Sequence, residues 1–206
     1  MKLYGFGPTR SLRVLWGLLE LGAEFEFVSV NLATGEHRHS DFLHLNPAGK
    51  LPVLVDGDVV LTESAAIVLY LAEKYPAKNL LPADLKTRAQ VYRWIMFAVT
   101  ELEQPLQRIA RHTVVYPEDK RLPGDVALAH QEFVAMAAVL DRHMEGRRFI
   151  VGDSVTAADC VTAYLVDWAN ERHLLEGCTQ LRAYLERMYA RATAPDRKST
   201  RLNSSH

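Results

Sequence analysis

Two hydroxyl side chains stand just before the first predicted helix and are the first candidates for chemistry. Thr9 and Ser11 lie in the loop GPTRS, residues 7–11, and the apolar residues that follow recur at helical spacing. A hydroxyl at a helix start, helped by the positive end of the helix dipole, can stabilise an anion such as a thiolate. The backbone N–H of Arg10 is a further donor. The alternative is that Thr9 or Ser11 only caps the helix.

The stretch from Asn46 to Ser64, NPAGKLPVLVDGDVVLTES, contains a second group of candidates. Two short apolar runs, 52–55 and 59–61, flank an Asp-Gly turn and predict a tight β-hairpin. Ser64 directly precedes an apolar-periodic segment, so we predict that it caps the N-terminus of a helix. Such a helix start has unpaired N–H groups and a partial positive charge, and it can hold a carboxylate.

The run GKLPVL, followed by TES and AAIVLYL, resembles the glutathione-binding half of the cytosolic glutathione transferases. The nearest pattern is that of theta- or delta-like members or a related bacterial class, and the resemblance covers residues 1 to 195. It implies a cis bond between Leu51 and Pro52. The Leu51 backbone would then pair with the cysteinyl unit of glutathione, and Glu63 and Ser64 would hold its γ-glutamyl end.

The resemblance also implies cations at the glycine end of glutathione. Lys50 and His37 are the expected cations, because His37 lies in the string GEH, which delta-like members share. His39 is the alternative to His37. Without the resemblance, each of these residues would be read as a solvated loop residue.

Thr9 stands where theta- and delta-like members carry a catalytic serine, so the hydroxyl is kept and a methyl is added. The thiol of glutathione resembles free Cys, with a pKa of about 8.5. Lowering that pKa by about two units requires roughly 2.7 kcal/mol, which one charge-assisted hydrogen bond with helix-dipole help can supply. Ser11 and the Arg10 N–H are the substitutes for Thr9. Tyr4 is predicted to be a core residue, with a tyrosine role as the alternative.

A pocket for the second substrate is expected on the long helix of the second half. Trp94, Phe97, Glu101 and Gln104 share one face at helical spacing. Such a stripe more often belongs to a core, but the resemblance implies that part of this helix forms the electrophile pocket.

The elements that must position these residues fall into two halves. Strands at 2–6 and 25–30, helices at 12–19 and 41–45, the hairpin and the helix from Ser64 give the order β-α-β-α-β-β-α, typical of a thioredoxin-like α/β domain over residues 1–77. After a linker, strand patterns nearly vanish, and we expect an all-α C-terminal domain over 84–195. Its predicted helices are 85–112 with a kink at Pro105, 125–145 capped by Asp125, 157–172 with a Thr156–Asp159 capping box, and 180–192.

The composition excludes several other classes. The net charge of −1 argues against a broad nucleic-acid surface. Cys160 and Cys178 are the only cysteines and predict neither a metal site nor a disulfide framework. We found no apolar run of membrane-spanning length and no signal peptide, so a cytoplasmic protein is expected. Residues 196–206, DRKSTRLNSSH, lack any apolar period and read like a translated sequencing adapter, so we expect a non-native tail.

The resulting hypothesis is a glutathione transferase that conjugates the glutathione thiolate to small hydrophobic electrophiles in detoxification. Glutathione would be a cosubstrate, with no separate cofactor, and the resemblance implies a homodimer. Two alternatives remain open at this point: a glutathione-dependent disulfide or peroxide reductase, and a non-catalytic binding protein with the transferase fold.

Overall fold

The computed structural model describes residues 1–196, which form two compact units. The first unit contains Met1–Leu81 together with the segment that starts at Tyr189, and the second contains Pro82–Met188. The sequence led us to expect domains at 1–77 and 84–195. The observed units differ from these chiefly at the C-terminal end, because the chain from Tyr189 on belongs to the first unit. The predicted non-native tail lies outside the described residues, except for Asp196.

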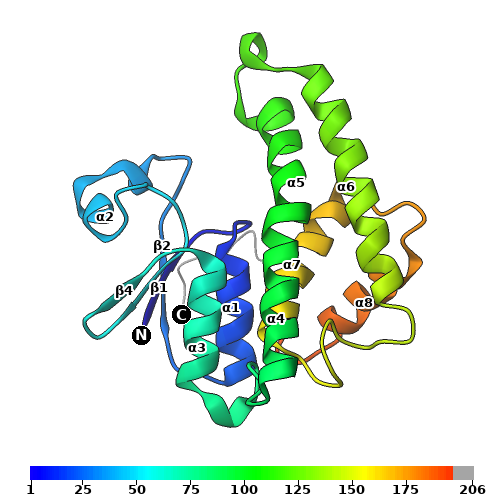
Figure 1. Ribbon diagram of the computed structural model, residues 1–206. Coiled ribbons are helices and arrows are strands. Elements are labelled where there is room, and N and C mark those ends of the chain that lie inside the picture. The colour runs from blue at the N-terminus through cyan, green and yellow to red at the C-terminus, as the bar shows by residue number, and fades with distance from the viewer. Residues whose placement is uncertain (197–206) are drawn as a thin grey trace. The chain divides into compact units, whose positions relative to one another are not determined.

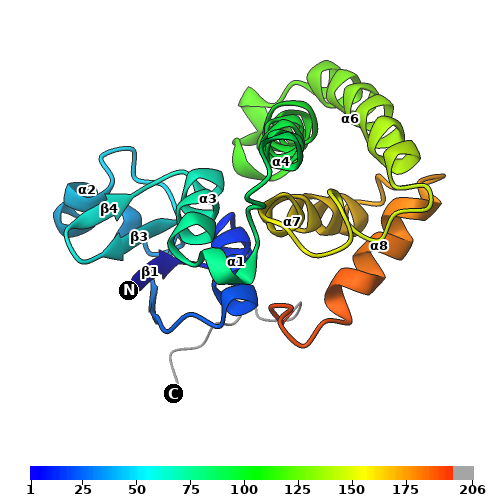
Figure 2. The same ribbon diagram turned by 60° about the horizontal axis from the view of Figure 1, so that its bottom comes forward.

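The first unit is built on a four-stranded sheet in the order β2 (Glu26–Ser29), β1 (Lys2–Gly5), β3 (Val53–Asp56) and β4 (Val59–Leu61). Strands β1 and β2 are parallel, as the β-α-β pattern predicts, and the β3–β4 hairpin is antiparallel. Helices α1 (Ser11–Leu21) and α3 (Ser64–Lys74) pack side by side along the sheet (Figures 1 and 2). The thioredoxin-like prediction is confirmed.

The two faces of the sheet bury different residues, as alternation along a strand requires. Leu3 and Leu54 are fully buried, together with residues of α1 and α3 such as Leu18 and Leu71. Tyr4 and Val53, which follow the opposite alternation, pack in a second cluster with Phe42 of the short helix α2 (Ser40–Leu45). The 3-10 turn η1 (Glu36–Arg38) leads into α2, and η2 (Pro76–Lys78) follows α3.

The second unit is all-α, as predicted. A continuous helical path runs through α4 (Leu85–Phe97), the π-turn η3 (Ala98–Leu102), α5 (Glu103–Ala110) and a second π-turn η4 (Arg111–Val115). After the 3-10 turn η5 (Glu118–Lys120), α6 (Pro123–His143) lies alongside α5 in Figure 1. Helices α7 (Ala157–Glu171) and α8 (Thr179–Tyr189) are the last two helices of the described residues, and most residues of α7 are buried.

The start of α7 has the predicted capping box. Asp159 accepts hydrogen bonds from the backbone N–H of Thr156 at 2.8 Å and of Ile150 at 2.9 Å, and from the Tyr184 hydroxyl at 3.1 Å. Burial raises the pKa of Asp159 to about 6, and the hydrogen bonds it accepts oppose this rise. Asp159 therefore organises the helical core. Cys160 is also fully buried, as a small core residue would be.

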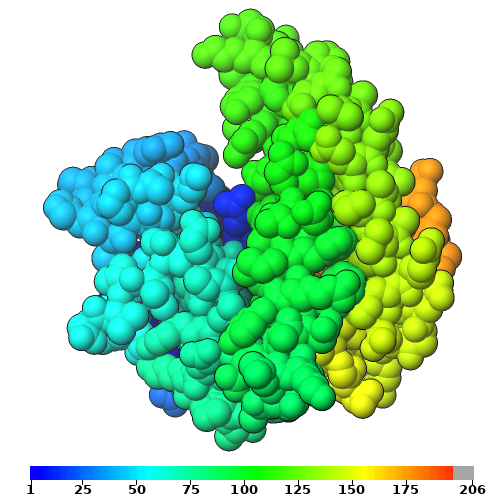
Figure 3. Space-filling view, in the orientation of Figure 1, coloured from blue at the N-terminus to red at the C-terminus, as the bar shows by residue number. Residues whose placement is uncertain are grey.

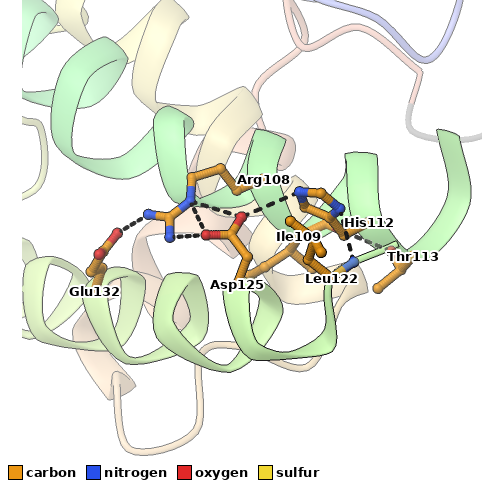
Figure 4. A network of polar contacts seen from close by, with 7 residues as sticks. All are labelled: Arg108, Ile109, His112, Thr113, Leu122, Asp125 and Glu132. Carbon is orange, nitrogen blue, oxygen red and sulfur yellow. Dashed lines mark hydrogen bonds and ion pairs between the residues drawn. The ribbon is translucent and has the colours of Figure 1, made fainter. Parts of the chain in front are cut away.

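The prediction that Asp125 caps α6 is wrong. The helix begins two residues earlier, with Pro123 in the first turn, where a missing N–H does no harm. Asp125 instead accepts from Nε of Arg108 at 3.1 and 3.2 Å, while Arg108 also binds Glu132 (Figure 4). His112 also contacts Asp125, with its Nε2 3.3 Å from Asp125 Oδ2. The hydrogen bonds from Arg108 hold the pKa of Asp125 below its usual value, and the network ties α5 to α6.

Beyond this network, the end of α5 and the segment that leads to α6 project from the helical unit (Figure 3). Val114, Val115 and Leu122 are exposed there. None of the helices in the described part of the chain is both long enough and apolar enough to cross a membrane.

Candidate functional site

The strand registers bring three separate segments to one end of the sheet in the first unit. Leu54 pairs with Leu61, so continuing the antiparallel register by two residues places Pro52 opposite Glu63. Tyr4 pairs with Val53, which places the end of β1 beside Pro52. The loop after β1, the start of β3 and the end of β4 therefore meet, and they carry most of the predicted ligand residues.

The Leu51–Pro52 bond is cis, as the resemblance implied. Leu51 is 8% exposed and packs in the cluster that contains Phe42. This packing of the side chain helps to fix the position of the Leu51 backbone. Asn46 shapes the turn before it, because its Nδ2 donates to the Lys50 carbonyl at 2.8 Å. A second cis bond, Gly7–Pro8, was not predicted from the sequence.

Thr9 and Ser11 form a connected hydroxyl pair with their oxygens 2.8 Å apart. The Thr9 hydroxyl donates to the Phe6 carbonyl, so its one proton is engaged there and the Ser11 hydroxyl must donate to Thr9. Ser11 is 2% exposed, whereas Thr9 is half-buried. Neither side chain caps α1 in the usual way, since the N-cap position is Arg10, which has no side-chain cap bond. The pair joins the loop to the first turn of α1, and only Thr9 keeps appreciable access.

The start of α3 differs by one residue from the prediction. Glu63 occupies the N-cap position with φ of 62° and ψ of 106°, and Ser64 is the first helical residue. Such a conformation is strained for a residue with a side chain, and strain of this kind is concentrated at functional sites. Glu63 is exposed, while the Ser64 hydroxyl is buried and accepts a hydrogen bond from Arg13 Nη1 at 3.1 Å. Arg13 was not among the residues predicted from the sequence, although a cation inside an apolar-periodic helix could have marked it.

The predicted cations of the glycine end lie in two loops that touch. A Cβ atom built on Gly49 would lie 3.0 Å from the His37 carbonyl oxygen and 3.2 Å from Arg38 Nη1. Gly49, with φ of 60°, therefore lets the 36–39 segment approach the segment that carries Lys50. His37 Nδ1 is buried and has no hydrogen-bond partner in the described structure. Arg38 is a third cation at this place, and the sequence analysis missed it.

The two alternative candidates of the first unit, His39 and Tyr4, lie elsewhere. Both line a cavity of about 270 Å³ between α2 and the sheet, where none of the other predicted glutathione residues is found. Its lining residues are Tyr4, Val28, Val30, Glu36, His39, Asp41, Phe42 and Leu45.

The predicted electrophile stripe does not form one open face. Trp94 is 3% exposed, with its ring centroid 4.0 Å from that of His143 and 5.1 Å from that of Phe97, so it belongs to the helical core. Phe97 is half-buried, and Glu101 and Gln104 are exposed. Trp94 and Phe97 precede the π-turn at 98–102, which adds a residue to the helical turn and displaces the residues after it, Gln104 among them, from the face that α-helical spacing assigns them.

Among the described residues, no group of three or more His, Cys, Asp or Glu side chains could hold a metal ion. The site combines main-chain groups, an acid and hydroxyls at one end of the sheet with cations in the adjoining loops, and this set matches the functional groups of a short, charged peptide.

Comparison with known proteins supports this description. Residues 1–73 match the family "Glutathione S-transferase, N-terminal domain", and residues 106–187 match "Glutathione S-transferase, C-terminal domain". Glutathione S-transferase F10 of Arabidopsis thaliana is 34% identical over 191 residues, covering 88% of each chain. Glutathione S-transferase 3 of Zea mays is 35% identical over 192 residues, covering 90% of this chain and 86% of its own.

Solved structures give the same result. A glutathione S-transferase domain-containing protein of Marinobacter aquaeolei VT8 superposes with a TM-score of 0.85 at 26% identity, covering 95% of this chain and all of that one. Glutathione S-transferase-I bound with lactoylglutathione superposes with a TM-score of 0.79 at 25% identity, covering 94% and 95% of the two chains.

Proposed function

Because the chain belongs to the glutathione S-transferase family and is therefore a transferase, we propose that it joins the thiolate of glutathione to a small hydrophobic electrophile. The observation that carries the proposal is the meeting of the cis Leu51–Pro52 bond, the strained Glu63 and the accessible Thr9 at one end of the sheet. Glutathione enters as a cosubstrate, and no further cofactor is needed.

Each part of glutathione has a complementary group among the residues of this site. The main chain of Leu51, next to Pro52, would pair with the cysteinyl unit as a strand pairs with its neighbour. Glu63 would bind the γ-glutamyl ammonium, and Ser64 with the start of α3 would bind the neighbouring carboxylate. Lys50 and His37, supported by Arg38, would face the glycyl carboxylate.

Thr9 is the best candidate for the group that stabilises the thiolate, because Ser11 is nearly inaccessible. To donate to sulfur, the Thr9 hydroxyl must turn away from the Phe6 carbonyl, which loses a neutral hydrogen bond of about 1 kcal/mol. The charge-assisted bond that replaces it is worth about 1.5–3 kcal/mol, so the exchange is favourable. Ser11 can follow by keeping its bond to the Thr9 oxygen, and the N–H of Arg10 remains a second donor.

The reaction is a nucleophilic attack. The thiol proton leaves to solvent, the thiolate forms a C–S bond to the electrophilic carbon, and the bond to the leaving group breaks or, in an addition, the electron pair moves onto the acceptor. Phe97 and Glu101 remain the candidates for the electrophile pocket. Trp94 is buried and would contribute indirectly, by packing against the Phe97 ring. We further propose a homodimer in the cytoplasm, both by analogy with the family.

The test has three arms on the full chain. Isothermal titration should show glutathione binding, which His37→Ala weakens and His39→Ala, in the neighbouring cavity, leaves unchanged. A panel of aryl halides, epoxides and activated alkenes should yield glutathione conjugates, detected by mass. Binding without any conjugate, but with turnover of a mixed disulfide or a peroxide, would replace the proposal with the reductase alternative. Absence of binding in a folded protein would favour the non-catalytic one.

A further inference from the structure

The short helix α2 covers only part of the sheet face that lies opposite α1 and α3 (Figure 2). Tyr4 of β1 and Val28 of β2 are partners in the parallel register, so their side chains are neighbours on this face. Helix α2 has only six residues, and Phe42 is its one buried side chain. Tyr4, Val28 and Leu45 therefore stay half-buried. A cavity of about 270 Å³ remains between the helix and the sheet.

The inner wall of this cavity is apolar and aromatic. Its apolar lining residues are Val28, Val30, Phe42 and Leu45. The Tyr4 ring stands edge-on to the Phe42 ring, with the two centroids 6.4 Å apart. An apolar cavity of roughly 150 Å³ holds one benzene molecule. The space between α2 and the sheet can therefore hold one aromatic ring with a short side chain.

The mouth of the cavity carries negative charge. Its polar residues are Glu36, His39 and Asp41, and none of the lining residues is a lysine or an arginine. Glu36 is held in place, because its Oε2 accepts the Asn31 N–H at 2.7 Å and its Oε1 accepts the Thr34 hydroxyl at 3.1 Å. Asp41 is exposed. Within the described part of the chain, neither carboxylate forms an ion pair.

These features together suit a small organic cation. Carboxylate oxygens have several lone pairs, so Glu36 and Asp41 can each accept a further hydrogen bond from an ammonium group. The face of the Tyr4 ring attracts a cation. Its hydroxyl has no hydrogen-bond partner among the residues that the structure describes, and it can accept as well. An anionic ligand would meet two like charges here, and a neutral one would gain nothing from them.

We propose that the cavity between α2 and the sheet binds a protonated aromatic amine, at a site separate from that of glutathione and not involved in the transfer reaction. The ring lies against Tyr4 and Phe42, and the ammonium group lies at the mouth beside Glu36 and Asp41. The inference does not depend on the proposed function, because no residue to which that proposal gives a role lines the cavity.

The experiment is an amide NMR titration of the full chain, which measures both the affinity and the place of binding. The probes are phenethylamine, the neutral phenethyl alcohol and the anionic hydrocinnamate, which share a ring and the same short chain. We expect the amine to shift the amides of Val28 and Leu45 and to bind about tenfold more tightly than the alcohol, with hydrocinnamate the weakest. Saturation with glutathione should leave the affinity for the amine unchanged.

Two sets of variants locate the site. Glu36→Gln and Asp41→Asn each remove one charge from the mouth and should weaken amine binding about fivefold, without effect on the alcohol. The double variant should lose the preference for the amine. Val28→Phe fills the cavity with a ring and should abolish binding of both probes. Val60→Phe is the matched control, because Val60 lies on the same face at the opposite edge of the sheet, outside the cavity.

Several results would overturn the inference. One is a parent protein that does not bind the amine at millimolar concentration, or that binds the amine and the alcohol equally. Another is displacement of the amine by glutathione, which would place the amine in the glutathione site.

Thermal unfolding checks that each variant is folded. Should Val28→Phe not fold, the double variant of Glu36 and Asp41 decides, and an unchanged amine-to-alcohol ratio refutes the proposal. A parent that binds the amine but not glutathione refutes the proposed function alone.

Discussion

The carboxylate of Glu20, near the end of α1, accepts two hydrogen bonds from the guanidinium of Arg191. Nε lies 2.7 Å from Oε1 and Nη2 lies 2.8 Å from Oε2. Thr193 adds a hydroxyl donor at 2.6 Å, and the Tyr189 ring packs 5.1 Å from that of Trp16. These contacts explain why the chain after α8 belongs to the first unit and not, as the sequence led us to expect, to the helical one. The Glu20 side chain is only 5% exposed, so its carboxylate is shielded from water, whereas the Arg191 side chain is 33% exposed.

Replacing Glu20 by Gln should lower the free energy of unfolding by about 2 kcal/mol at pH 7, because it removes a charge-assisted, bidentate partner of Arg191. Burial opposes ionisation of Glu20, but the hydrogen bonds from Arg191 and Thr193 prevail and lower its pKa. A lowered pKa in the folded state means stability that is present above the unfolded pKa and is lost as pH falls through the folded one.

The loss on Glu20→Gln should therefore shrink below about pH 4.5, the ordinary pKa of this carboxyl. Urea titrations at pH 7 and pH 3.5 measure it. Glu24→Gln, at an exposed acid shortly after the helix, is the control and should change little. An equal loss at both pH values would show that Glu20 acts through packing alone.

Thr9→Val keeps the shape of the side chain and removes its hydroxyl. We expect it to raise the pKa of the bound glutathione thiol by one to two units, about 1.4 kcal/mol for each unit, with a parallel fall in kcat near pH 7. Ultraviolet absorbance of the thiolate against pH measures the shift. Thr9→Ser is the matched control and should behave as the parent. An unchanged thiol pKa in Thr9→Val would transfer the role to the Arg10 N–H.

Two buried threonines, each 1% exposed, offer a paired test of hydrogen-bond satisfaction. Thr162 Oγ1 has no partner among the described residues, whereas the Thr156 hydroxyl donates to Asp159 at 2.9 Å. Thr162→Val should stabilise the protein by about 1 kcal/mol, since it removes an unsatisfied polar atom. Thr156→Val should destabilise it by about 1–2 kcal/mol through loss of the cap. Chemical denaturation of both variants decides, and a loss in both would contradict the argument.

His143 should make the protein less stable in mild acid. Burial lowers the pKa of His143, and the neighbouring charges of Arg147 and Arg93 add to the effect, so the folded state favours the neutral ring. Stability from this group is present above its ordinary pKa of 6.5 and is lost as pH falls from there to the lowered folded value. Asp159, with its raised pKa, acts in the opposite direction, so the informative quantity is the difference between variants.

The free energy of unfolding of the parent, minus that of His143→Gln, should therefore fall between pH 7.5 and pH 5. His130→Gln, at an exposed histidine of the same helix, is the control for replacing a histidine by glutamine. A flat difference for His143→Gln would mean that the His143 ring titrates in the folded protein as it does in the unfolded chain.

The sequence predicted the hairpin, the parallel β1–β2 pair and the capping box because each depends on residues close together in the chain. It placed the start of α3 one residue late, since the strained conformation of Glu63 is fixed by the hairpin and the helix together and leaves no signal in residue type. The predicted glutathione residues Leu51, Pro52 and Glu63 meet because a short motif carries all of them.

Contacts between residues far apart in the chain were harder to predict from the sequence. The bond between Arg13 and Ser64 joins residues 51 positions apart, and the one between Arg191 and Glu20 joins residues 171 apart. No spacing rule connects such residues. Asp125 was predicted to cap a helix because an aspartate near a helix start most often does so. It instead accepts hydrogen bonds from Arg108 on α5.

The π-turn at Ala98–Leu102 has a consequence for comparing lengths within this family. A π-turn holds one residue more than the α-helical turn it replaces, while the helix on either side keeps its own packing. A homologue one residue shorter here can thus form an unbroken α-helix and still place both flanking segments as they stand in this chain. A one-residue gap at this point would then record the absence of a bulge, with no shift in the contacts of α5.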